Sequence, residues 1–140
     1  MNPQQRPLRV IDIGSKTVGD VYPTFVTAEI GINHNGDLEI TKKLIDAAVE
    51  SGCDAVKFQK RSISRILTRE GLDAPYDNPN SFGKTYGEHK QALELSEEDY
   101  RELKDYCDEN DIIFCASGWD EESIDFLDSL GMAFFKMASA

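Results

Sequence analysis

Residues 54–61, DAVKFQKR, place one lysine inside a short apolar run and end in a polar cluster. An apolar run that does not alternate with polar residues is typical of a strand in a parallel sheet covered on both faces. Apolar residues at helical spacing precede it, namely Leu44, Ile45, Ala48 and Val49. Gly52 then marks the end of that helix. The two patterns predict a helix followed by a buried strand, which is the repeating unit of an α/β protein.

The same alternation continues along the chain. Besides residues 55–58, the apolar runs expected to form strands are residues 25–28, 112–116 and 133–137. Helices are expected to start at Gly36-Asp37, at Ser96 and at Asp120, because each offers an N-cap ahead of apolar residues at helical spacing. In the last helix, Ile124 and Leu127 are expected to face inward. About four parallel strands and three helices, joined by right-handed crossovers, therefore form the predicted α/β fold.

Two segments lie outside this alternation. Residues 8–24, with a turn near Gly19-Asp20, are interpreted as a β-hairpin ahead of the first strand. Residues 60–95 form a connection far longer than the roughly 2–6 residues usual between a strand and a helix, and such long connections are often functional. The predicted organisation is an N-terminal hairpin over residues 1–24 and an α/β unit over residues 25–140.

The charge of the chain is concentrated in one stretch. The net charge is −11, of which residues 94–128 carry −12 and the remainder +1. This balance argues against a nucleic-acid partner, because phosphate backbones are bound mainly by clustered Lys and Arg. The acidic stretch is interpreted as a solvated outer helix surface, which leaves an anionic metabolite compatible with the basic residues elsewhere.

The cysteines and the apolar runs indicate where in the cell the protein is expected. Cys53, Cys107 and Cys115 form no C-x-x-C pair, so neither a disulfide framework nor a zinc site is expected. The N-terminus lacks the apolar segment of a signal peptide, and no run approaches the roughly 18 residues that a membrane span needs. We expect a cytoplasmic protein that contacts no membrane.

Polar residues stand at the carboxyl end of every expected strand. They are Glu29, Lys57, Gln59, Ser117, Lys136 and Ser139. The carboxyl ends of parallel strands are where α/β proteins build their active sites. The lysines and serines suit a phosphate or a carboxylate, and Glu29 suits general acid/base chemistry or a sugar hydroxyl. The alternative is that the two lysines merely pair with Glu29 or with other carboxylates.

Three other side chains have open interpretations. His34 follows the first strand and is either a hydrogen-bonded loop residue or a substrate contact. His89 is interpreted as structural or at the rim of a site, and Trp119 as a packing residue. With only two histidines, far apart in sequence, the chain has no convincing metal site of its own.

Several motifs occur together and in order. They are residues 28–36 AEIGINHNG, 54–61 DAVKFQKR, 86–90 YGEHK, 93–96 LELS and 135–139 FKMAS. This set resembles the N-terminal domain of the N-acetylneuraminate (sialic acid) synthase family, which includes legionaminate- and pseudaminate-forming relatives. The resemblance runs from about Phe25 to Ala140 and implies the first half of a (β/α)₈ TIM barrel. A complete barrel needs about 250 residues.

The resemblance also implies a reaction and roles for residues. The family condenses phosphoenolpyruvate with an N-acylated aldohexose such as N-acetylmannosamine, giving a nine-carbon 2-keto sugar acid and phosphate, with a divalent metal, Mn or Mg. Glu29 and Gln59 match positions near the reacting centre, Asn80 matches a loose sugar contact, and the residues matching phosphoenolpyruvate contacts are Lys57, Ser117, Lys136 and Ser139. The family's metal-binding histidines and its C-terminal antifreeze-like domain, which completes a homodimer, lie further along, so no metal ligand is expected in this chain.

Two alternatives stay open. Lys57 or Lys136 could form a Schiff base, which would make the protein an aldolase. The 140 residues could instead be an inactive fragment or a truncated paralogue that binds only a ligand or a partner chain. Half a barrel on its own is expected to be poorly stable or oligomeric, because its sheet edges are open.

Overall fold

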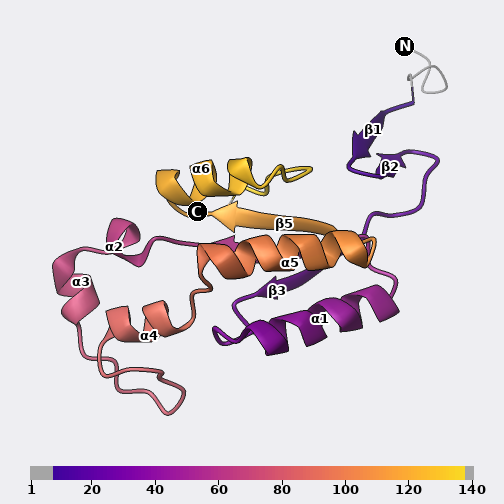
Figure 1. Ribbon diagram of the computed structural model, residues 1–140. Coiled ribbons are helices and arrows are strands. Elements are labelled where there is room, and N and C mark those ends of the chain that lie inside the picture. The colour runs from indigo at the N-terminus through magenta and orange to yellow at the C-terminus, as the bar shows by residue number, and fades with distance from the viewer. Residues whose placement is uncertain (1–7, 138–140) are drawn as a thin grey trace.

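A three-stranded parallel sheet forms the centre of the protein. The structure is a computed structural model that describes residues 8–137 (Figure 1). The sheet has the order β3-β4-β5, and its strands are β3 Thr27–Gly31, β4 Ala55–Lys60 and β5 Ile113–Gly118. Two further strands, β1 Val10–Ile13 and β2 Lys16–Gly19, pair with each other as a separate antiparallel hairpin.

The three predicted long helices are confirmed. They are α1 Leu38–Glu50, α5 Glu97–Glu109 and α6 Glu121–Ser129. Asp37, Ser96 and Asp120 each cap their helix, since each side chain accepts from a backbone N–H in the first turn. One inward residue was predicted wrongly: Ile124 is half exposed, because α6 turns the face with Phe126 and Leu127 toward the core.

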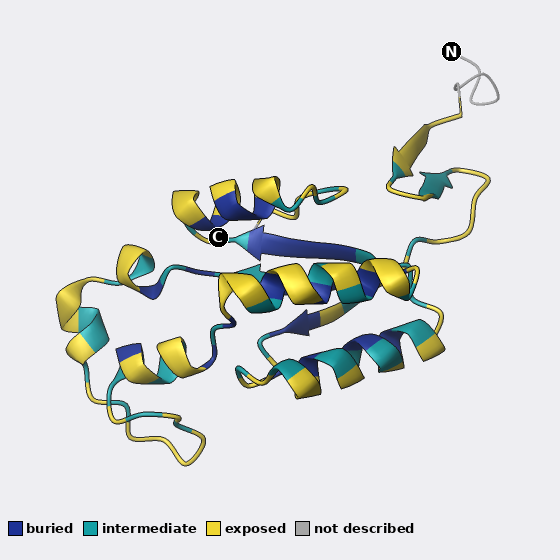
Figure 2. Ribbon diagram, viewed as in Figure 1, coloured by how far each residue is buried: buried dark blue, intermediate teal, exposed yellow. Residues whose placement is uncertain are grey.

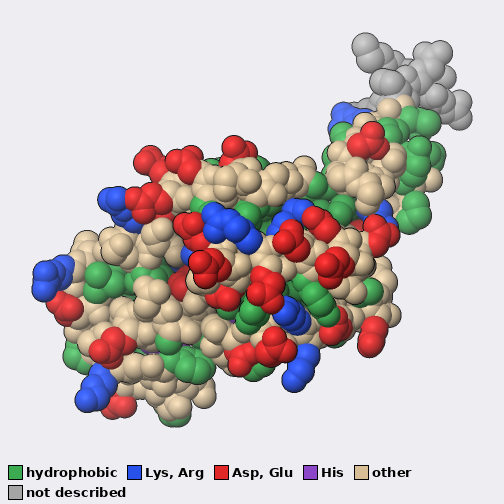
Figure 3. Space-filling model, in the orientation of Figure 1, with side chains coloured by type: hydrophobic (Ala, Val, Ile, Leu, Met, Phe, Trp, Pro, Cys, Tyr) green, Lys and Arg blue, Asp and Glu red, His purple; other side chains and the backbone are tan. Residues whose placement is uncertain are grey.

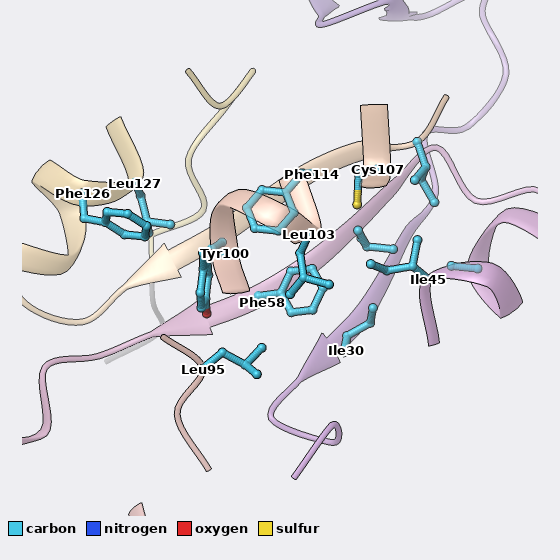
Figure 4. Packing of buried hydrophobic residues seen from close by; sticks show 14 residues of the cluster. Ile30, Ile45, Phe58, Leu95, Tyr100, Leu103, Cys107, Phe114, Phe126 and Leu127 are labelled. Atoms are coloured by element: carbon cyan, nitrogen blue, oxygen red, sulfur yellow. The ribbon is translucent and has the colours of Figure 1, made fainter. Parts of the chain in front are cut away.

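The apolar core lies between one face of the sheet and the helices (Figure 4). Phe58 stacks on Phe114 with ring centroids 5.1 Å apart, and Tyr100 of α5 meets both rings edge-on. Successive residues of a strand point to opposite faces of the sheet. Val56 and Phe58 face the helices, so the residue between them faces away. Lys57 therefore lies on the other face of β4.

The predicted hairpin is confirmed. Its turn was predicted at the wrong place: the chain reverses at Gly14-Ser15, where Gly14 takes φ +57°, and the turn at Gly19-Asp20 instead follows β2 at the open end of the hairpin. A Cβ built on Gly14 would lie 3.3 Å from both Ile113 and Ala133, so the hairpin turn packs closely against the start of β5. In Figure 1 the hairpin lies at the amino ends of the strands, away from the ends expected to carry the site.

The fourth predicted strand is not formed within the described residues. Residues 133–137 follow α6 and have no ladder with β5 or with any other described segment. Residues 133–137 are instead attached to β5 through a side chain: Ser117 Oγ donates a 2.8 Å hydrogen bond to the Lys136 carbonyl. A side-chain contact of this kind fixes one point of the backbone and does not impose the repeated backbone pairing that defines a strand.

The long connection between β4 and α5 contains three short helices: α2 Ile63–Ile66, α3 Arg69–Asp73 and α4 Tyr86–Ala92. It lies at the carboxyl ends of the strands in Figure 1. Gly36, with φ +73°, lets α4 approach the turn after β3, because a Cβ there would collide with the Ala92 carbonyl oxygen. The connection is thus held against the same end of the sheet as the predicted site.

The acidic stretch follows its prediction with one exception. Acidic side chains cover the outer faces of α5 and α6, which are exposed (Figures 2 and 3). Glu94, at the start of the stretch, is instead buried, with a side chain 4% exposed. Among the described residues, no helix has the length and apolar character needed to cross a membrane.

Candidate active site at the carboxyl ends of the strands

An ion pair lies at the centre of the open sheet face. Glu29 of β3 and Lys57 of β4 are register partners, and Lys57 Nζ lies 2.6 Å from Glu29 Oε2. Lys57 is 8% exposed, whereas the Glu29 side chain is 54% exposed. The pairing anticipated as an alternative therefore exists. Because Glu29 reaches solvent, its carboxylate is accessible to a ligand while the ammonium of Lys57 is enclosed.

A small space separates Glu29 from Gln59. Gly31 ends β3 with φ +59°, and a Cβ built on it would lie 3.3 Å from Glu29 Oε1 and 3.4 Å from Gln59 Nε2. The missing side chain leaves room between a hydrogen-bond acceptor and a hydrogen-bond donor. The two residues predicted to be catalytic are thus brought together by the glycine between them.

Gln59 is held at both its backbone and its side chain. The Tyr100 hydroxyl donates a 2.8 Å hydrogen bond to the Gln59 carbonyl, and Arg61 Nη2 donates to Gln59 Oε1. Arg61 in turn pairs with the buried Glu94. No role was predicted for Arg61 or Glu94, although both stand inside the motifs that carried the family resemblance. Their signal in the sequence was a charged residue just after the strand run, Arg61, and an acidic residue between two leucines, Glu94.

The residues predicted to hold phosphoenolpyruvate are brought together only in part. Ser117 is the register partner of Gln59 and is 3% exposed. Ser117 and Lys57 share the open face of neighbouring strands, while Lys136 reaches the site through its backbone contact with Ser117 and is an exposed residue. Ser139 lies outside the described residues, so its predicted contact stays a prediction.

Asn80 lies in a different hollow, of about 310 Å³, between the loop after β3 and the long connection. Asparagine and aromatic side chains line it, among them Asn33, Asn35, Asn78, Tyr76 and Phe82. His89 belongs to the same lining and stacks on Tyr76 with ring centroids 4.6 Å apart, which fits its interpretation as a rim residue. Amide groups beside aromatic rings suit a ligand that is polar on its edges and apolar on its faces, as sugars are.

His34 has the environment of a structural loop residue. It is 1% exposed, and its Nδ1 accepts a 3.0 Å hydrogen bond from the Gly36 N–H. Its Nε2 is buried without a hydrogen-bond partner among residues 8–137. Burial lowers the pKa of the imidazole below its usual 6.5, and the nearby charge of Arg61 acts in the same direction. The neutral ring therefore belongs to the folded state.

His34 should make stability depend on pH. Below about pH 6.5 the unfolded chain binds a proton that the folded chain does not, so stability falls as pH falls, by at most about 1.4 kcal/mol per pH unit. His34→Asn keeps an acceptor for Gly36 and removes this titration. Urea unfolding at about pH 7.5 and about pH 5.5 should show a smaller loss for His34→Asn than for the parent. His89→Asn is the comparison: the pKa of His89 is also lowered, by partial burial and by Lys90, but its ring is less buried than that of His34, so its effect should be smaller. An equal effect of both substitutions would contradict the assignment.

The described residues offer neither a reactive thiol beside Lys57 nor a metal cluster. Burial raises the pKa of Cys115, beside Lys57, to about 12, so its thiol is not a nucleophile near neutral pH. All three cysteines are unpaired. Within residues 8–137, no group of three His, Cys, Asp or Glu side chains could hold a metal ion. The divalent metal implied by the family resemblance therefore does not fit the residues described.

Trp119 differs from its interpretation as a packing residue. Its side chain is 46% exposed, and the Arg61 guanidinium lies 5.3 Å from the centre of its ring. The indole is thus a surface platform for a cation. Trp119 is exposed because it comes just after β5, where the chain leaves the sheet toward α6.

The fold and the strand-end polar groups together define a parallel α/β protein whose candidate site lies at the carboxyl ends of its strands. Residues 44–140 match the model of the NeuB family. This is more than half of the chain, which therefore belongs to the NeuB family. The predicted relationship to sialic acid synthases is confirmed.

Similar proteins include synthases for several sugar acids. N-acetylneuraminate-9-phosphate synthase of Homo sapiens is 46% identical over 133 residues, covering 95% of this chain and 37% of that protein. N,N'-diacetyllegionaminic acid synthase of Legionella pneumophila is 43% identical over 127 residues, covering 90% and 36%. The chain thus spans a little over a third of the length of these relatives.

Solved structures agree on the fold. The spore coat polysaccharide biosynthesis protein SpsE of Bacillus subtilis superposes with a TM-score of 0.67 at 38% identity, covering 94% of this chain and 34% of that one. The N-acetylneuraminic acid synthetase of Leptospira borgpetersenii gives 0.73 at 24% identity, covering 93% and 41%, which concerns the fold alone. The predicted fold class, the first part of a TIM barrel with an N-terminal hairpin, is confirmed.

Proposed function

We propose that this chain supplies the phosphoenolpyruvate-binding side of a sugar acid synthase, which condenses phosphoenolpyruvate with an N-acylated aldohexose and releases phosphate. The observation that carries the proposal is the enclosed Lys57 near the carboxyl end of β4. Among residues 8–137, the carboxylate paired with it is that of the half-exposed Glu29. A buried cation whose partner is accessible to ligand suits exchange of that partner for a substrate anion.

The roles follow from the contacts. Lys57 would bind a phosphate or carboxylate oxygen. The Ser117 hydroxyl, which here donates to the Lys136 carbonyl, would have to turn its O–H toward the anion to join this contact. Once Lys57 is paired with substrate, Glu29 is released as a base or as an acceptor for a sugar hydroxyl. Gln59 would donate from its amide into the space over Gly31. Holding both substrates at one strand end lowers the entropic barrier to joining them.

Asn80 and its neighbours are proposed as the side of the site that binds the sugar. The hollow between the loop after β3 and the long connection offers side-chain amides and ring faces. The family-implied N-acetylmannosamine is the first candidate. A second is its 6-phosphate, because the human relative is named for a 9-phosphate product. Adding three carbons at C1 of a hexose turns its C6 into C9 of the product.

The proposal includes a divalent metal only because the family resemblance implies one. Bound near the sugar, such an ion would polarise the aldehyde as a Lewis acid. The residues described here offer no cluster to hold it, so no step is assigned to it. What these residues supply is anion binding, orientation and proton transfer.

A Schiff-base aldolase is the less favoured reading. Lys57 is the cation of an ion pair with Glu29, and an ammonium has no lone pair to attack a carbonyl. Borohydride reduction in the presence of a carbonyl substrate should leave Lys57 and Lys136 unmodified by mass spectrometry. A stable adduct on either lysine would favour the aldolase.

The experiment that tests the proposal is an assay of phosphate release. A complete protein containing this sequence should release phosphate only when phosphoenolpyruvate, a divalent metal and either N-acetylmannosamine or its 6-phosphate are all present. The 140-residue chain alone is expected to release none, because it spans 37% of the human relative. Absence of release from the complete protein with both sugars would reject the proposal, and release by the 140-residue chain would reject the expectation of incompleteness.

A further inference from the structure

Arg61 is a buried cation just beyond the end of β4, two residues after Gln59. It is 6% exposed, and its guanidinium is used on several sides. Nη2 donates to Gln59 Oε1, Nη1 lies 3.4 Å from Glu94 Oε1, and the group lies over the Trp119 ring. Its backbone N–H also donates to Glu94 Oε2, at 3.3 Å. An arginine held at so many points has little freedom to rotate.

The orientation of the Gln59 amide follows from this contact. A guanidinium has N–H donors and no acceptor, so the group facing it must be the amide oxygen. The NH₂ group then points the other way, toward the space over Gly31, where Nε2 lies 3.4 Å from a Cβ built on that glycine. Without Arg61, either end of the amide could face this space. With it, the site presents a donor there.

Glu94 explains why Arg61 stays in place. The two side chains are 5% and 4% exposed, and Glu94 comes from the long connection, 33 residues away in sequence. Burial raises the pKa of Glu94, and the charge of Arg61 opposes that change. A buried carboxylate of this kind needs a cation beside it. The long connection therefore fixes the arginine that fixes the amide.

We propose that Arg61 is a positioning residue, held by Glu94, that orients the Gln59 amide so that its NH₂ group faces the space beside Glu29. The site then offers an acceptor on Glu29 and a donor on Gln59, at opposite sides of Gly31. It selects a substrate with an acceptor oxygen next to a hydroxyl donor, as in a hydroxyaldehyde. This last step rests on the proposed function; the orientation of the amide does not.

The orientation is tested by ¹⁵N relaxation of glutamine side-chain amides in the 140-residue chain. In the parent, the order parameter of the Gln59 side-chain amide should be about 0.85, as in rigid structure, and in Arg61→Met it should fall below about 0.6. Arg65→Met is the matched control, because it removes an exposed arginine paired with Glu122 and should leave Gln59 unchanged. Gln91 serves as a reference signal in every sample.

A second variant covers loss of folding. Arg61→Met leaves Glu94 buried without its cation, whereas Arg61→Met with Glu94→Gln leaves no charge unpaired. If Arg61→Met fails to fold, the double variant must show the loosened amide. A folded double variant with a rigid Gln59 amide would overturn the proposal.

Kinetics of the complete protein separate positioning from general damage. Arg61→Met should lower kcat/KM by roughly tenfold to a hundredfold, as expected for a displaced reactive group. In a protein that already carries Gln59→Ala, Arg61→Met should lower kcat/KM no further, because there is no amide left to orient. A further loss of equal size would overturn the proposal. If the parent has no synthase activity, the proposed function fails while the order parameters still decide the role of Arg61.

Discussion

Replacing Lys57 with methionine is expected to leave stability within about 1 kcal/mol of the parent or to raise it, while weakening phosphoenolpyruvate binding by roughly ten- to 150-fold. The binding loss corresponds to about 1.5–3 kcal/mol for a hydrogen bond to a charged group. The stability result follows from burial. Lys57 is 8% exposed, so its ammonium has lost hydration that methionine does not need. Glu29 is half exposed and stays hydrated when its partner is removed.

Lys42→Met is the control for this prediction. Lys42 also pairs with a carboxylate at 2.6 Å, on Glu102, but this ion pair joins α1 to α5 on the helix side of the sheet, opposite the open face that carries Lys57. Stability is measured by urea unfolding of the 140-residue chain, and the Michaelis constant for phosphoenolpyruvate in the complete protein. Lys42→Met should leave that constant unchanged. A Lys57→Met protein that is strongly destabilised and retains its affinity would make Lys57 a structural residue.

The fold was predictable where local signals agree with one another. Around Lys57, a non-alternating apolar run indicated a buried parallel strand, and the period of two in a strand placed Lys57 and Gln59 on one face. The capping residues Asp37, Ser96 and Asp120 gave three helix starts correctly, because a cap acts within one turn of the chain. The location of the candidate site at the strand ends followed from these two facts.

Other features depend on contacts that have no local signal. The ion pair of Arg61 with Glu94 joins residues 33 apart, and only the folded long connection brings them together. Residues 133–137 have the composition of a strand, but a strand also needs a backbone partner, and within the described residues they have none. The exposure of Trp119 likewise depends on where the chain leaves β5.

Gly31→Ala is the second substitution with a large expected effect. Gly31 has φ +59°, a conformation that costs a non-glycine residue about 1–2 kcal/mol, so stability should fall by that amount. The new methyl group would also lie 3.3 Å from Glu29 Oε1 and 3.4 Å from Gln59 Nε2, in the space proposed for the reacting groups. Synthase activity of the complete protein should therefore fall by roughly a hundredfold or more, beyond the effect of stability.

Gly52→Ala separates these two causes. Gly52 follows α1 with φ +73°, and a Cβ there would meet nothing within 4 Å among the described residues. The backbone strain is therefore similar to that of Gly31→Ala, and the crowding is absent. Urea unfolding should give similar losses for both variants, and phosphate release should be lost only in Gly31→Ala. If both variants keep parental kinetics, the space between Glu29 and Gln59 is not where substrate reacts, and the site must be sought elsewhere on the open face of the sheet.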